Sequence, residues 1–173
     1  SLSRFAERGC MVHSDNAKAV RDSEIILLAV KPYNYADIIK GIRTVLNPKK
    51  HVIVSVITGV WMEELQKAIG KPVPVIRAMP NTAIAIQQSM TCLAHAGASE
   101  KQLNYIQELF GVLGRTVMID EKLMDAATVL GACGTAYAMR YIRANIQGGI
   151  EIGFDAATAS LIAAQTIKGA AQL

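Results

Sequence analysis

The sequence predicts an α/β protein in which a doubly wound, mostly parallel sheet is followed by an all-α segment. Three observations predict this class. Continuous apolar runs bounded by turn residues recur before residue 120, amphipathic helical patterns lie between them, and an Ala-rich stretch without any strand signal follows. Strands that alternate with helices indicate a doubly wound sheet. We therefore place a domain boundary near residue 120, which separates residues 1–120 from residues 121–173.

The predicted strands are short runs of apolar residues. A run that is apolar throughout, rather than alternating, is typical of a strand that is buried on both faces. The clearest example is "EIILLAV" at 24–30, which ends at Lys31 and Pro32. The remaining predicted strands are 51–58, 73–79, 89–95 and 116–120, with a further possible strand at 9–14.

The predicted helices show apolar side chains at helical spacing. Residues 36–46 and 60–69 have this pattern, and Ser99 with Gln102 forms a capping box that begins the helix running to Gly114. Beyond the boundary, an Ala-rich helix covers 123–146, and Asp155 caps another that runs to Leu173. We interpret the glycines of "GGIEIGF" at 148–154 as the turn between these two helices.

Composition excludes several classes of protein. Of the 173 residues, 51% are hydrophobic and 18% are charged, which supports a sizeable core and argues against disorder. No uncharged apolar run reaches the roughly eighteen residues of a membrane span, and the first ten residues do not resemble a secretion signal. The net charge of +4 comes from scattered Lys and Arg, so we expect no nucleic-acid partner and no membrane partner.

The cysteines and histidines give no sign of a disulfide framework or a metal site. Three cysteines without a CxxC pair favour a reduced, cytoplasmic protein. The three histidines lie far apart without metal-ligand spacing, so we expect no metal. Cys133 could be a nucleophile, but no histidine lies downstream of it, which favours a small buried thiol in tight helix packing.

Unusual residues follow three of the predicted strands. These are Lys31–Pro32, Thr58–Gly59 and the tripeptide Pro80–Asn81–Thr82. In an open α/β sheet, ligands bind beyond the carboxyl ends of the strands, so these tips could rim one crevice. Asn81 and Thr82 could equally form a local turn through their side chains, and the motif alone does not decide between the two interpretations.

Five motifs occur in an order and at a spacing that resemble the pyrroline-5-carboxylate reductase family. They are "LLAVKP" (27–32), "VSVITGV" (54–60), "VIRAMPNTA" (75–83), "LMDAATVLGACGTAYAMRYI" (123–142) and "AAQTIKGAAQL" (163–173). The resemblance implies a Rossmann-like dinucleotide-binding domain at 1–120 and a helical dimerisation and substrate domain at 121–173. It also implies reduction of the C=N bond of 1-pyrroline-5-carboxylate to L-proline, the last step of proline biosynthesis, with hydride from NADPH or NADH.

The resemblance also assigns site residues by motif. Those that would border the cofactor are Asn16, Ala29, Val30, Lys31, Pro32, Val56, Ile57, Thr58, Gly59, Pro80, Asn81 and Thr82. Those on the substrate side would be Cys133, Gly134 and Thr135. No catalytic residue is assigned within this chain. The Ala-rich helices imply a homo-oligomer, a dimer or higher, that forms through this segment.

The sequence departs from the family pattern at three places. The G-x-G-x-x-G loop that cradles the pyrophosphate does not occur in it, and neither does the "SPGGTT"-like substrate loop. Where the family reads "SGSGPAY", this chain reads "GACGTAY" at 131–137. From the first two departures we expect the 173 residues alone to be inactive. Two alternatives stay open: another dehydrogenase of the β-hydroxyacid type, and a non-catalytic dimerising remnant.

Overall fold

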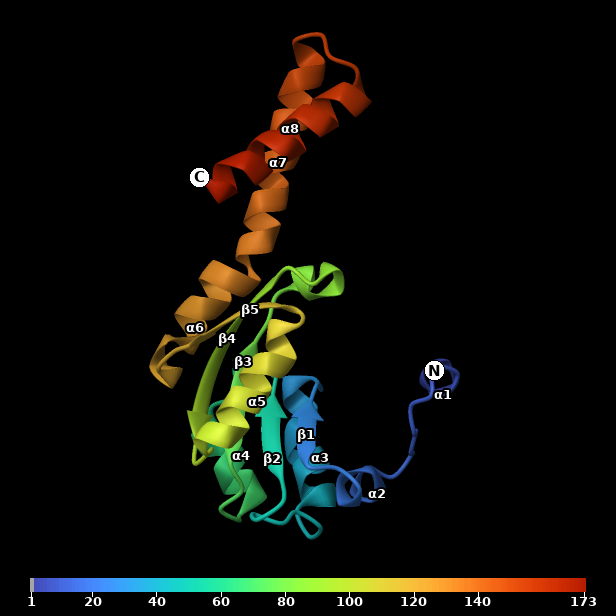
Figure 1. Ribbon diagram of the computed structural model, residues 1–173, viewed down its shortest axis with the longest axis vertical. Helices are drawn as coiled ribbons and strands as arrows, with labels where there is room; N and C mark the ends of the chain where they lie inside the picture. The colour runs from blue at the N-terminus through green and yellow to red at the C-terminus, as the bar shows by residue number, and fades with distance from the viewer. Residues whose placement is uncertain (1) are drawn as a thin grey trace.

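The computed structural model describes residues 2–173 as a five-stranded sheet with helices on its faces, from which a long helical hairpin extends (Figure 1). The strands are β1 (Ile25–Leu28), β2 (Val52–Ser55), β3 (Val75–Met79), β4 (Ser89–Ala96) and β5 (Gly114–Met118). The α-helices are α1 (Ser3–Ala6), α2 (Asn16–Arg21), α3 (Tyr35–Ile42), α4 (Met62–Ile69), α5 (Glu100–Gly111), α6 (Met124–Ala127), α7 (Gly134–Glu151) and α8 (Ala156–Gln172). Three 3₁₀ turns and a π-helix complete the fold: η1 (Pro32–Asn34), η2 (Thr82–Ile86), η3 (Glu121–Leu123) and the π-helix η4 (Thr128–Ala132).

The sheet has the order β1-β2-β3-β4-β5, and only the β3–β4 pair is antiparallel. This is the mostly parallel, Rossmann-like sheet that the sequence predicts. In the register of the first three strands, Leu28 pairs with Ser55, and Ser55 pairs with Arg77. The carboxyl ends of β1, β2 and β3 therefore meet at one edge of the sheet.

Two apolar clusters lie on opposite faces of the sheet. The larger one joins β1 and β2 to α3 and α4, with Ile39, Ile53 and Leu65 fully buried. The smaller one lies beneath α5, around Ile106 and Phe110. A sheet covered by helices on both faces explains why β2 and β3 consist entirely of buried residues.

Strand β1 corrects one prediction from the sequence. The run 24–30 was expected to be buried on both faces, but burial alternates along β1, and the Leu27 side chain is 54% exposed. Ile26 and Leu28 face the larger cluster, whereas Leu27 lies on the face that α5 only partly covers. An apolar run cannot distinguish a central strand from an edge strand, because the difference depends on what packs against it.

The possible strand at 9–14 is wrong. These residues form no strand in the structure, and the Met11 side chain is 81% exposed. In Figure 1 the chain between α1 and α2 runs apart from the sheet, so no described strand lies beside it to accept its hydrogen bonds. A strand requires such a partner, and the apolar pattern does not reveal whether one exists.

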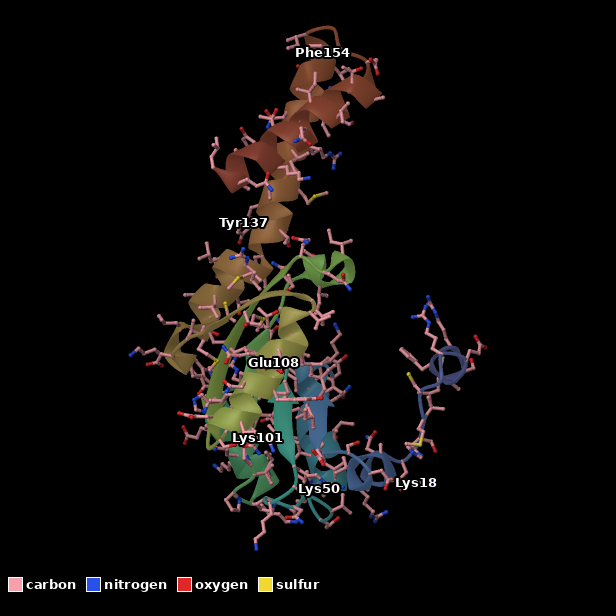
Figure 2. The ribbon with its side chains drawn as sticks, in the orientation of Figure 1. Lys18, Lys50, Lys101, Glu108, Tyr137 and Phe154 are labelled. Carbon is pink, nitrogen blue, oxygen red and sulfur yellow. The ribbon has the colours of Figure 1, made fainter. Side chains whose placement is uncertain are left out.

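The helical segment begins after β5 and contains the long hairpin of α7 and α8. Asp155 caps α8 as predicted, and its carboxylate accepts hydrogen bonds from the backbone N–H groups of Ala157 and Thr158. Figure 2 shows Tyr137 near the sheet end of α7 and Phe154 at the far tip of the hairpin. None of the helices among residues 2–173 combines the length and apolar character needed to cross a membrane.

The glycines of 148–154 correct a further prediction. Only Gly153, with φ +113°, lies in the turn between the helices, whereas Gly148 and Gly149 lie inside α7. A Cβ atom at Gly149 would come within 3.1 Å of the Ala159 Cβ. Gly149 therefore allows α7 and α8 to approach closely, which is the usual role of small residues between packed helices.

His51 is buried just before β2. Its Nδ1 accepts a hydrogen bond of 2.9 Å from the backbone N–H of Asn47, while its Nε2 has no hydrogen-bond partner among residues 2–173. Burial lowers the pKa of His51 below its ordinary value, and the charges of Lys50 and Lys71 lower it further, against a smaller opposing effect of the Ser23 carbonyl. His51 is therefore neutral at physiological pH.

Candidate functional site

The candidate site is the edge of the sheet at the carboxyl ends of β1, β2 and β3. Leu28, Ser55 and Arg77 lie side by side in β1, β2 and β3. Lys31, Thr58 and Pro80 each come three residues after one of them. The register therefore brings the three predicted tips to the same edge. Three adjacent parallel strands ending together form the usual ligand-binding edge of an open α/β sheet.

The first tip follows β1. Ala29 and Lys31 are exposed, and Val30 is half-buried against the larger cluster. Pro32 starts the 3₁₀ turn η1, in which the backbone N–H of Asn34 donates to the Lys31 carbonyl. The Lys31 ammonium has no hydrogen-bonding or ionic partner among the described residues, so its charge is free to meet an anion.

The second tip follows β2. Ser55 is buried, and its hydroxyl accepts a hydrogen bond of 3.3 Å from the backbone N–H of Ile57. The Ile57 side chain is itself buried in the core, so only its main chain could face a ligand. Thr58 and Gly59 are exposed, and Gly59 has φ +76° with open space where a Cβ would lie. Because Gly59 has no side chain, a ligand could come close to the backbone at this position.

The third tip follows β3, and Asn81 makes three hydrogen bonds there. Its Oδ1 accepts from the backbone N–H of Ala83 at 3.1 Å, which forms the local turn that starts η2. Its Nδ2 donates to the carbonyl of Gly131 at 3.1 Å, fifty residues further along the chain. Its backbone N–H donates to the Ser89 hydroxyl at 3.2 Å. The turn interpretation is thus confirmed for Asn81, while the exposed Thr82 side chain makes no such bond in the described residues.

Asn16 does not lie with these tips. It begins α2 and lines a groove of about 280 Å³ along the free edge of β1, together with Ala19, Leu27 and Val30 of the first tip. The groove runs from α2 toward the end of β1. A ligand that reached both Asn16 and Lys31 would therefore have to be extended along this edge.

The substrate-side residues lie at the start of α7. Cys133 is exposed, whereas Gly134 and Thr135 are half-buried. The Cys133 thiol is therefore not the buried packing group that sequence patterns favour. The Thr135 hydroxyl donates to the Ala132 carbonyl at 3.1 Å. This segment is joined to the site edge through the Asn81–Gly131 hydrogen bond.

Sequence reasoning missed the residues that hold the helical segment to the sheet. Arg77 is 2% exposed in β3, and its Nη1 lies 2.9 Å from Oε1 of Glu121. The same carboxylate oxygen accepts from the backbone N–H of Met62 at 2.7 Å, and the Arg77 guanidinium lies 5.4 Å from the Trp61 ring centre. The signal was present, since a single charge inside an apolar strand requires a buried partner.

The metal-ligating residue types do not cluster in the described part of the chain. No group of three His, Cys, Asp or Glu side chains among residues 2–173 is arranged to hold a metal ion. All three cysteines are free, and burial raises the pKa of the Cys92 thiol. A hollow of about 690 Å³ lies between α7 and α8 and has a mainly apolar lining.

Two known families match different parts of the chain. A family model described as pyrroline-5-carboxylate reductase dimerisation matches residues 121–173. A second, described as NADP oxidoreductase, coenzyme F420-dependent, matches residues 1–59.

Similar curated proteins are pyrroline-5-carboxylate reductases. The chain is 40% identical to pyrroline-5-carboxylate reductase 1 of Dictyostelium discoideum, over 100% of this chain and 33% of that protein. It is 36% identical to pyrroline-5-carboxylate reductase 2 of the same organism, over 95% of this chain and 60% of that protein. It is 32% identical to the pyrroline-5-carboxylate reductase of Methanosarcina acetivorans, over 97% of this chain and 62% of that protein. The chain thus spans less than two thirds of the length of each of these relatives.

Solved structures of the same name share the fold. The pyrroline-5-carboxylate reductase of Coxiella burnetii superposes with a TM-score of 0.93 at 26% identity, over 99% of this chain and 64% of that one. The Plasmodium falciparum pyrroline carboxylate reductase, described with NADP bound, has a TM-score of 0.86 at 25% identity, over 92% of this chain and 61% of that one.

Proposed function

This chain belongs to the pyrroline-5-carboxylate reductase family, and from this membership we propose that it is the nucleotide-facing and dimerising portion of an enzyme that reduces 1-pyrroline-5-carboxylate to L-proline. NADPH is the proposed hydride source, because the model matched by residues 1–59 is that of an NADP oxidoreductase and one similar structure is described with NADP bound.

One observation carries the proposal for the cofactor edge. Lys31, Thr58 and Thr82 are exposed at the ends of three adjacent strands, and their polar side-chain groups have no partner among the described residues. Elsewhere in the fold, by contrast, buried polar groups such as those of Arg77 and Ser89 are paired. Unpaired donors gathered at one sheet edge are available to a polar ligand.

The residues at this edge fit a dinucleotide in their chemistry. Lys31 supplies a cation for phosphate, and Gly59 with the main chain of Val56 and Ile57 offers a surface for close approach. β3 ends at Met79, directly before Pro80, and the 3₁₀ turn η2 begins at Thr82. The nicotinamide, when bound, supplies a hydride to the C=N carbon while the imine nitrogen takes up a proton.

Cys133, Gly134 and Thr135 are proposed to border the substrate. They begin α7, in the segment that Asn81 connects to the site edge. The Thr135 hydroxyl is engaged with the Ala132 carbonyl, so it holds the main chain there and is not a free proton donor. No residue of this chain is proposed as the proton donor.

The hairpin of α7 and α8 is proposed to form a homodimer. Large apolar side chains are exposed along it although the hairpin has little core of its own: Tyr137, Met139, Tyr141, Ile152, Phe154, Leu161 and Ile162. Such a surface is typical of helices that pack against a partner. Sedimentation at micromolar concentration should give twice the monomer mass, and a monomer would contradict the proposal. The free cysteines suit the cytoplasm, where we expect the protein to reside.

NADPH binding and 1-pyrroline-5-carboxylate reduction test the function in the intact protein as the cell makes it. We expect the protein to bind NADPH and to reduce the substrate, and the loss of NADPH absorbance monitors this turnover. Lys31→Met should weaken NADPH binding about tenfold, or ~1.4 kcal/mol, because it removes a charge-assisted contact. The matched control is Lys101→Met, since Lys101 is an exposed lysine at the start of α5, near the opposite end of the sheet (Figure 2).

Two results would contradict the proposal. An intact protein that binds no NADPH is the result that the non-catalytic dimeric remnant predicts. Equal weakening by Lys31→Met and Lys101→Met would mean that the edge at β1 to β3 does not hold the cofactor.

A further inference from the structure

We propose that Asn81 is a positioning residue, which fixes the start of α7 against the cofactor edge through its Nδ2 bond to the Gly131 carbonyl. This inference deepens the proposed function and rests on it for the catalytic consequence. It is compatible with the expectation that the turn at Pro80–Asn81–Thr82 borders the cofactor, and it gives the Asn81 side chain a role within that turn.

Both polar atoms of the Asn81 side-chain amide are hydrogen-bonded within the protein. Oδ1 is held by Ala83 and Nδ2 by Gly131, each at 3.1 Å, and the backbone is held by Ser89. Ser89 is 3% exposed, and its hydroxyl lies 3.3 Å from that of Thr91. The turn is therefore anchored to β4 on one side, which orients the amide toward the helical segment.

The segment that receives this bond departs from regular α-helix. The backbone N–H of Cys133 donates to the Thr128 carbonyl five residues earlier, which marks the π-helix η4. The Thr128 hydroxyl donates to the Met124 carbonyl, a bond that is known to bend helices. A π-helical turn interrupts the regular backbone hydrogen bonding of an α-helix. Here the side chains of Asn81 and Thr135 donate hydrogen bonds to the carbonyls of Gly131 and Ala132, respectively.

Two polar contacts in different places join the helical segment to the sheet, in addition to the apolar packing of Met124, Ala127 and Ala132 on the larger cluster. Glu121 binds Arg77 and the Met62 N–H near its beginning, and Gly131 binds Asn81 ten residues later. The first contact lies inside β3 and fixes where the segment begins. The second lies at the end of β3, where the proposed cofactor edge and the proposed substrate-side residues meet.

The Asn81–Gly131 bond therefore sets the separation between the two halves of the proposed site. Hydride transfer depends steeply on the placement of donor and acceptor, and a displacement of about 1 Å can cost a hundredfold in rate. A loosened start of α7 should lower kcat with little effect on NADPH binding, because the tips after β1 and β2 stay intact.

Asn81→Asp in the intact protein tests the proposal. The carboxylate keeps an oxygen to accept from Ala83, so the local turn is preserved, but its second oxygen has no proton to donate to Gly131. The matched control is Asn47→Asp, because Asn47 forms the same kind of turn, with its Oδ1 accepting from the backbone N–H of Lys49 at 2.9 Å. In the described part of the chain, Asn47 makes no hydrogen bond to the helical segment.

Three quantities are measured for each variant. Amide hydrogen exchange of residues 128–137 should become about tenfold faster in Asn81→Asp and stay unchanged in Asn47→Asp. The kcat for 1-pyrroline-5-carboxylate reduction should fall about 10- to 100-fold, while the Kd for NADPH should change by less than about threefold. Asn81→Ser, whose hydroxyl preserves the turn but is too short to reach Gly131, should behave as Asn81→Asp does.

Two outcomes would overturn the inference, and a third would overturn the proposed function alone. Unchanged exchange at 128–137 would show that the bond does not hold this segment. A tenfold rise in Kd for NADPH with unchanged kcat would make Asn81 a cofactor contact instead. If the wild-type protein reduces no substrate, the proposed function fails, and the exchange result still decides whether Asn81 positions α7.

Discussion

Removal of the buried Arg77–Glu121 ion pair should destabilise the protein far more than removal of an exposed pair of the same length. Arg77 Nη1 lies 2.9 Å from Glu121 Oε1, and the two side chains are 2% and 20% exposed. Lys122 Nζ lies 2.9 Å from Asp120 Oδ2, but those side chains are 76% and 54% exposed. The two neighbouring pairs therefore differ in burial and not in distance.

The expected magnitude follows from what each substitution leaves behind. Arg77→Met keeps the apolar length of the side chain but leaves the Glu121 carboxylate without its cation, which in a buried pair costs about 3–5 kcal/mol. Glu121 is one-fifth exposed and still accepts from Met62, so we expect the lower end, about 3 kcal/mol. Loss of the contact with Trp61 adds up to about 1 kcal/mol.

Equilibrium unfolding in urea, followed by far-ultraviolet circular dichroism, measures the change. Trp61 fluorescence alone is unsuitable, because Arg77 contacts that ring in the folded protein. Glu121→Gln and the double variant complete a thermodynamic cycle, in which we expect a coupling of about 2 kcal/mol. Lys122→Met should leave the midpoint unchanged within error, because exposed pairs contribute little.

Equal effects of Arg77→Met and Lys122→Met would refute this reasoning. So would strictly additive single substitutions, because these would mean that Arg77 and Glu121 contribute independently. In either case the attachment of the helical segment would have to depend on apolar packing, for example of the buried Met124.

The remaining predictions concern a glycine and a histidine. Gly114→Ala should destabilise the protein by at least about 3 kcal/mol in urea unfolding, since φ is +144° and a Cβ would lie 2.1 Å from the Ser89 carbonyl oxygen. Gly111→Ala, with open space inside α5, should instead stabilise it by up to about 1 kcal/mol, and similar losses at both sites would contradict the reasoning. His51 has a folded pKa below its ordinary value of 6.5, so the unfolded chain binds more protons between the two values; its contribution to stability is complete above about pH 6.5 and is lost as the pH falls through the folded pKa. Unfolding free energies between pH 8 and 5 should show this loss in wild type and less of it in His51→Asn, whereas an equal loss in both would exclude His51 as its source.

Much of the fold could be predicted from local pattern. The apolar runs located five strands, the Ser99–Gln102 capping box located the start of α5, and Asp155 located the start of α8. These signals depend on a few neighbouring residues, so the sequence carries them directly. The strand ends were predicted to form one edge for the same reason, since parallel strands that follow one another end on the same side.

Other features depended on which segments meet. The sequence could not show that Leu27 is exposed, that residues 9–14 lack a partner strand, or that Gly149 faces Ala159. Arg77 looked like an anomaly in an apolar strand until the structure placed Glu121 beside it. Each of these facts is a contact between residues distant in the chain, which local pattern does not encode.

The site shows the same division. The sequence by itself determined the class of fold, the strand tips and the family motifs, because backbone preference and apolar periodicity are local properties. Only the tertiary structure decided that the side chains of Lys31 and Thr58 have no partner among residues 2–173, while Asn81 is bound to Gly131. Whether a polar group is free depends on every other group within hydrogen-bonding distance, and that set is fixed only when the chain has folded.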